Sequence, residues 1–176
     1  MKKIILGIVA AFTAILTGCK TTPSTDTMYS SSYAIGVSAA LVMNQTKISD
    51  EDRNIIIDIV NEVNASVPDT NTTFSVAWTT IAQKHVDDLV TAGKLDEAQS
   101  KIIMSLFTAA VKTIDYVVYK RYPVVGQNIE LIEAVTHGFC NGLLTYYTPA
   151  NTVAAAVGPK TVYDKEAYDY MLKLTK

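Results

Sequence analysis

Apolar side chains recur along most of this chain at steps of three and four residues, the spacing that places them on one face of an α-helix. Phe74, Trp78 and Ile81 form one such series. We expect helices over residues 32–46, 49–67, 71–92, 95–122 and 127–147, a short helix over 153–157, and a last helix that starts near Asp164. The pattern therefore predicts an all-α fold, a bundle of five to six helices in a single domain that spans residues 32–176.

Small and polar residues show where these helices end and how they pack. Ser49 precedes three acidic residues, which is typical of a helix start, and Gly93 suits a helix end. The helix over 32–46 is apolar on nearly every side, which predicts a central position in the bundle. Gly138 and Gly142 lie four residues apart, so we expect another backbone to approach closely there.

The first nineteen residues follow a different pattern. Lys2 and Lys3 precede an uncharged run, Ile4 to Leu16, that is shorter than the roughly 20 apolar residues a membrane-spanning helix needs. A basic start, an apolar run and then small residues indicate a secretory signal. The run ends in Leu16-Thr17-Gly18-Cys19, which resembles the lipobox of bacterial lipoproteins.

This resemblance implies that residues 1–18 are removed by cleavage between Gly18 and Cys19. It also implies a diacylglycerol on the Cys19 sulfur and a third acyl chain on its amine, so that the protein is anchored to a membrane rather than spanning it. Lys20 stands where enteric-type lipoproteins carry an aspartate for inner-membrane retention, which favours the outer membrane. The alternative is an ordinary signal peptide cut elsewhere, with Cys19 a free thiol.

The segment after Cys19 is rich in threonine and serine and contains Pro23. Such a composition buries too little apolar surface to order itself. We therefore expect residues 19–31 to form a short flexible tether between the lipid and the helical domain.

Charge argues against two classes of partner. Removal of residues 1–18 would leave 13 Lys and Arg against 17 Asp and Glu, a net charge of −4. A mild acidic excess disfavours nucleic-acid binding, which needs a basic face, and disfavours charge-driven binding to anionic lipid. The partners we expect are the membrane, through the lipid anchor, and an envelope protein; the sequence carries no signal for an oligomeric state.

The candidate chemistry is sparse, and we expect neither catalytic residues nor a cofactor or metal. Cys140 lies in an apolar stretch and is expected to be a buried small side chain. His137 follows Glu133 by one helical turn, but two potential ligands do not make a zinc site. His85 lies on an apolar stripe with Trp78, where we expect a hydrogen-bonded core or groove histidine.

Tyrosines gather in the C-terminal third, with eight of ten from Tyr116 onward. At 100° per residue, Tyr119 falls opposite the core stripe of its helix and Tyr116 falls on its flank. Tyrosine is favoured at protein interfaces, so these two residues form a candidate partner surface. The alternative is that they cover the C-terminal segment.

Three functional hypotheses follow. The first is a lipid-anchored envelope lipoprotein that acts as a non-enzymatic scaffold or interaction protein. The second is a helical binding module for a small apolar or lipidic ligand held near Trp78 and His85. The third is an envelope enzyme.

Overall fold

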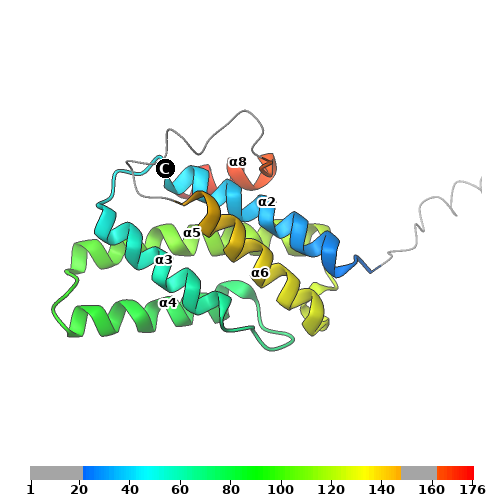
Figure 1. Ribbon diagram of the computed structural model, residues 1–176, viewed down its shortest axis with the longest axis horizontal. Helices are drawn as coiled ribbons and strands as arrows, with labels where there is room; N and C mark the ends of the chain where they lie inside the picture. The colour runs from blue at the N-terminus through cyan, green and yellow to red at the C-terminus, as the bar shows by residue number, and fades with distance from the viewer. Residues whose placement is uncertain (1–21, 148–161) are drawn as a thin grey trace, which may run out of the picture.

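The computed structural model describes residues 22–147 and 162–176. In chain order, the described elements are α2 (Thr25–Met43), α3 (Asp50–Asn64), α4 (Phe74–Thr91), α5 (Glu97–Arg121), the short 3-10 turn η1 (Val125–Gln127), α6 (Ile129–Tyr146) and α8 (Lys165–Leu174). These residues contain six α-helices and no strand, which confirms the predicted all-α bundle (Figure 1). The short helix expected over 153–157 lies outside the described residues.

Side-chain caps fix where the helices begin. The hydroxyl of Ser49 accepts the backbone N–H of Asp52 at 3.0 Å, as the sequence predicted for the start of α3. Asp164 accepts the N–H of Ala167 at 3.0 Å and caps α8 at the predicted position. Asp96 and Gln99 form a reciprocal capping box at the start of α5.

The predicted tether is too long, because α2 begins at Thr25 rather than near residue 32. Ser24 caps this helix by accepting the N–H of Thr27 at 3.2 Å. Met28 then enters the core with no exposed surface. Residues 25–31 look polar in sequence because the serines and threonines of this first part mostly face outward, while one buried methionine supplies the packing that composition does not reveal.

The helices α2 and α6 form the closest pair in the bundle. A Cβ atom on Gly138 would collide with the carbonyl oxygen of Tyr29, and one on Gly142 would collide with that of Tyr33. Gly36 of α2 lies in the same way against the backbone of α6. The predicted close backbone approach is therefore confirmed, and so is the central position of the apolar α2 helix.

A cluster of aromatic rings fills the interior beside this pair. The ring of Trp78 lies 4.8 Å from that of Phe74 and 5.5 Å from that of Phe139, between ring centroids. The thiol of Cys140 is buried as predicted, and burial raises its pKa to about 12. Aromatic rings therefore gather in the core where α4 packs against α6.

The longest helix, α5, contacts α2, α3, α4 and α8. It is the one described helix long and apolar enough to cross a membrane, and more than half of its apolar window is buried in the bundle. The core helix of a soluble protein meets the same criterion. Figure 1 shows α5 running the length of the molecule behind α3, with α4 alongside it.

Candidate functional site

The tyrosines predicted as a partner surface lie where α8 crosses α5. The rings of Tyr116 and Tyr170 stack at 4.1 Å between centroids, with 7° between their planes. Tyr116 remains 39% exposed. The ammonium of Lys120 lies 5.3 Å from the centre of the Tyr116 ring, a cation–π distance. This surface therefore presents a stacked tyrosine pair beside a cation, and we call the pair the Tyr116–Tyr170 step.

Four charged side chains join the two helices beside this step, and we call them the α5–α8 ion cluster: Lys120, Arg121, Asp164 and Glu166. The guanidinium of Arg121 donates to both carboxylate oxygens of Asp164, at 2.5 and 3.1 Å, and to Glu166 at 2.9 Å. Lys120 donates to the other oxygen of Glu166. Lys120 and Arg121 lie in the last turn of α5, where cations stabilise the helix dipole, and they also hold α8.

The pKa values of the two acids follow from these contacts. Burial alone would raise the pKa of Asp164, but hydrogen bonds from Arg121 and from the Ala167 N–H outweigh it and lower that pKa below 3.8. Hydrogen bonds from Lys120 and Arg121 lower the pKa of Glu166. Both carboxylates are therefore ionised at neutral pH.

Tyr119 does not lie opposite the core, contrary to the sequence-based expectation. It is half-buried, and its ring lies 5.8 Å from that of Phe74. Burial raises the pKa of its hydroxyl. The helical projection was wrong here because α5 is packed on several sides, so the face opposite one stripe is also covered. Of the two predicted tyrosines, Tyr116 is the more exposed to a partner.

The two residues of the predicted ligand pocket, Trp78 and His85, have different surroundings in the structure. Trp78 is completely buried among aromatic rings, and its indole Nε1 has no hydrogen-bond partner. His85 lies at the helix surface, where its Nδ1 is 3.0 Å from the carboxylate of Glu62 on α3. This confirms the hydrogen-bonded groove histidine. Four hollows on the described surface are lined by other residues.

The second histidine also contacts α3. The Nδ1 of His137 lies 2.9 Å from the side-chain oxygen of Asn64. Within residues 22–147 and 162–176, no group of three or more histidine, cysteine or acidic side chains could hold a metal ion. The histidines of this part of the chain link α3 to two of its neighbours, α4 and α6.

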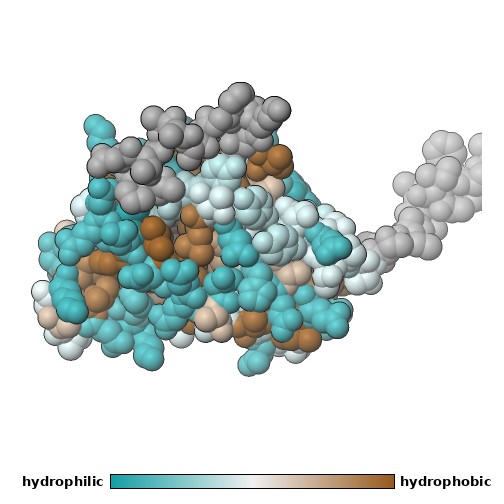
Figure 2. Space-filling view, viewed as in Figure 1, coloured by the Kyte–Doolittle hydropathy of each residue, from teal (hydrophilic) through white to brown (hydrophobic). Residues whose placement is uncertain are grey.

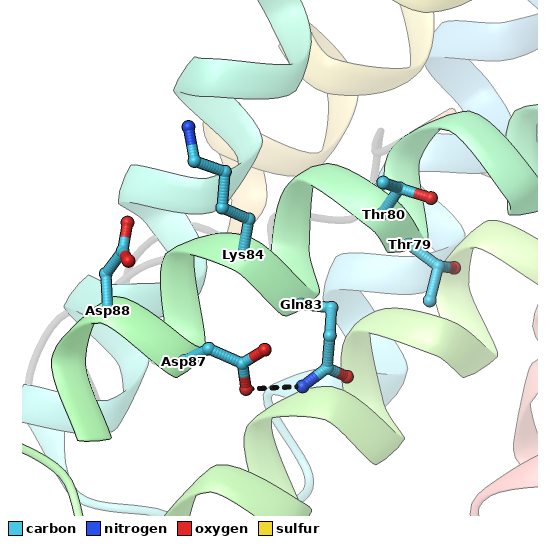
Figure 3. Close-up of a pocket in the computed structure, with 6 residues that line it drawn as sticks. All are labelled: Thr79, Thr80, Gln83, Lys84, Asp87 and Asp88. Atoms are coloured by element: carbon cyan, nitrogen blue, oxygen red, sulfur yellow. Dashed lines mark hydrogen bonds between the residues drawn. The ribbon is translucent and has the colours of Figure 1, made fainter. Parts of the chain in front are cut away.

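A polar hollow lies along the outer face of α4. Figure 3 shows its six residues, all from one helix, with the amide of Gln83 donating to Asp87 at 2.8 Å. Lys84, Asp87 and Asp88 face solvent. Because no second element closes over them, these side chains form a solvated helix face and not a catalytic cleft.

Two charged side chains, one buried and one half-buried, make contacts that were not anticipated from the sequence. Arg53 is 2% exposed, donates to Asn44 at 2.7 Å and lies 4.9 Å from the ring centre of Tyr147. Asp115, on α5, accepts the backbone N–H groups of Phe74 and Ser75 at 3.0 Å each and so caps α4 from a neighbouring helix. No local spacing in the sequence predicts either contact, because the partners are brought together by folding.

The pKa values of these regions fit a structural role. Burial raises the pKa of Asp115, even though its hydrogen bonds from Ser75 and Phe74 act in the opposite direction. Burial also raises the pKa of Tyr147 to about 12. Asp115 binds helix N–H groups, and Tyr147 stays neutral against a guanidinium, so both groups hold helices together.

Comparison with known protein families, with curated proteins and with solved structures finds no match to this chain. The functional argument therefore depends on the residues of the chain and on their arrangement.

Proposed function

We propose that this chain is a lipid-anchored bacterial envelope lipoprotein that acts as a non-enzymatic scaffold or interaction protein for an envelope partner. One observation carries the proposal: Leu16-Thr17-Gly18-Cys19 closes an uncharged apolar run that follows two lysines. A run of this length with small residues at its end is typical of an export signal. The cysteine at the cut site supplies the acceptor for lipid, and Lys20 favours the outer membrane.

Lipid attachment gives a physical mechanism for such a protein. Each buried methylene contributes about 0.8 kcal/mol, and two acyl chains suffice for stable anchoring. A protein confined to a thin layer at a leaflet meets membrane partners at a raised effective concentration. Modest contacts by the helical body are then enough to hold a complex.

The packing of the interior favours a scaffold over a ligand-binding module. A small apolar ligand near Trp78 would need free volume, and the rings of Phe74 and Phe139 occupy the space against the indole. On the outside, the exposed Tyr116–Tyr170 step and the neighbouring Lys120 offer the kind of aromatic and charged surface that protein interfaces favour.

Metabolic labelling with palmitate tests the anchor. We expect the wild-type chain to incorporate label, the Cys19→Ala variant to incorporate none, and the Cys140→Ala variant to be labelled like the wild type. Cys140 is the matched control because it is the one cysteine in the described residues and is buried in the folded body. An unlabelled wild-type chain, or label that survives in Cys19→Ala, would refute lipidation at this residue.

A pulldown from detergent-solubilised envelopes tests the partner surface. We expect Tyr116→Ala to weaken capture of the envelope partner about tenfold, equivalent to about 1.4 kcal/mol, as for an interface tyrosine. Val90→Ala is the control, because Val90 is 40% exposed and lies near the far end of α4. Equal capture by all three proteins, or no enriched envelope protein with the wild type, would contradict the interaction role.

A further inference from the structure

The distance between the lipid acceptor and the folded body is short. The cap of α2 is Ser24, five residues after Cys19. Fully extended, five residues span at most about 18 Å. Because α2 is packed into the core from its first turns, the end of the bundle that holds Thr25 cannot lie farther than this from the acylated residue.

The contacts of α2 identify which elements share that end. Tyr29 of α2 lies against Gly138, and Tyr33 lies against Gly142, so α2 and α6 run in the same direction. The start of α6 and the preceding turn η1 therefore lie at the same end as the start of α2. Figure 1 shows the start of α2 and the start of α6 together on the right.

This end exposes apolar side chains, which we call the anchor-end patch: Pro123, Val124 and Ile129. Val124 is 37% exposed and Ile129 is 45% exposed. Figure 2 shows hydrophobic surface at the lower right, where the start of α6 and the turn between α3 and α4 lie. No other described residue covers the exposed parts of Val124 and Ile129.

We propose that the anchor-end patch rests in the headgroup region of the leaflet that holds the acyl chains. The occupant is a lipid surface, because the covalent link to Cys19 keeps this end within about 18 Å of the lipid in every orientation. Apolar side chains at a membrane interface are stabilised by leaving water. The bundle then contacts the leaflet through the end that holds the starts of α2 and α6, and the C-terminal end of α4 lies away from the membrane.

Attraction between opposite charges does not hold the anchor-end patch against the lipid. The nearest cations in the sequence, Lys120 and Arg121, are already bound by Glu166 and Asp164. Glu130, next to Ile129, is exposed. The contact is therefore apolar and directed to zwitterionic as well as anionic lipid.

This inference depends on the proposed lipid anchor, and the experiment separates the two. The full chain is produced with its own signal, purified in detergent and reconstituted into phosphatidylcholine vesicles that carry a nitroxide-labelled acyl chain. One introduced thiol, Val124→Cys or Val90→Cys, carries a fluorophore. The acylated Cys19 has no free thiol, and the buried Cys140, whose pKa is about 12, does not compete for the label.

Val90→Cys is the matched control. Val90 is as exposed as Val124 and lies near the start of α5, whereas Val124 follows its end. The 25 residues of α5 separate these positions by about 37 Å. We expect the lipid nitroxide to quench the label at 124 several-fold more than the label at 90, with melting temperatures of both variants close to that of the wild type.

Each outcome has a distinct meaning. Protein that floats with the vesicles while the two labels are quenched equally, or while neither is quenched, would overturn the orientation and leave the anchor intact. Protein that does not float with the vesicles would overturn the anchor, and the orientation with it.

Discussion

Tyr116 and Tyr119 lie three residues apart on α5, yet their rings have different surroundings. Tyr116 stacks on Tyr170 of the last helix and keeps an exposed edge. Tyr119 packs against Phe74 inside the bundle. Residue type and spacing are alike at the two positions, so the difference comes from the helices that happen to pack there.

Truncation of the two tyrosines should separate a packing role from a surface role. We expect Tyr119→Ala to lower the free energy of unfolding by about 2 kcal/mol, because it leaves a cavity beside Phe74. Tyr116→Ala should lower it by less than about 1 kcal/mol, because much of its ring is already in water. Urea unfolding followed by circular dichroism gives both values, and equal losses would show that our assignment of Tyr119 to the core is wrong.

The helix pair α2–α6 depends on the absence of side chains at its crossing. Gly36 of α2 and Gly138 and Gly142 of α6 all lie against backbone atoms of the facing helix. Backbone cannot move aside as a flexible side chain can. The pair is therefore intolerant of even one added methyl group.

Gly138→Ala should destabilise the protein although alanine is the better helix former. Alanine gains about 1 kcal/mol of helix propensity, but its Cβ would collide with the carbonyl oxygen of Tyr29. Overpacking of this kind costs about 1–3 kcal/mol, so we expect a net loss of stability in urea unfolding.

Thr145→Ala is the control on the same helix. Thr145 is exposed, and its replacement should change the free energy of unfolding by no more than about 0.5 kcal/mol. A Gly138→Ala variant more stable than this control would rule out the tight crossing.

At the scale of elements, apolar periodicity and capping residues were enough to predict which segments form helices. The apolar stripes, Ser49 and Asp164 placed the starts of α3 and α8 correctly. The predicted start of α2 was wrong because Met28 is one apolar residue in a polar stretch and therefore shows no helical periodicity. A lone side chain shows its burial only when the opposing helix is known.

The candidate site was less predictable for the same reason. Arg121 and Asp164 are joined across two helices, and no spacing rule connects them. Asp115 caps a helix other than its own. The excess of late tyrosines did lead to Tyr116, but the ion cluster beside it arises from tertiary structure.

The free energy of unfolding of the whole molecule should depend on pH, because carboxylates with lowered pKa values and a carboxylate with a raised pKa affect it in opposite directions. The lowered pKa values of Asp164 and Glu166 stabilise the folded state above their ordinary values of 3.8 and 4.5, and this contribution is lost as the pH falls through their folded values. The raised pKa of Asp115 acts in the opposite sense, because its ionisation above pH 3.8 costs stability.

A variant at Arg121 isolates the ion cluster from this background. Arg121→Gln should lower the free energy of unfolding at pH 7, and the difference from wild type should shrink as the pH falls through the lowered pKa values of Asp164 and Glu166, because these acids then become protonated in both proteins. The contribution of Asp115 is common to both proteins and cancels. Urea unfolding at a series of pH values measures the difference.

The control for the ion cluster is Lys112→Gln, which removes an exposed cation on the same helix. Its difference from the wild type should stay small and nearly constant with pH. If Arg121→Gln gave a difference that did not depend on pH, the carboxylates would not be the groups that hold α8.

The pairing of α2 with α6 also has a consequence for the biogenesis of the protein. Among the described helices α2 is synthesised first, and it can pack against α6 only after most of the chain has been made, because Tyr29 lies against Gly138. Contacts between such distant segments form slowly. For the exported protein that we propose, α2 would stay without its main packing partner until α6 has been made, and chaperones would shield its apolar surface until then.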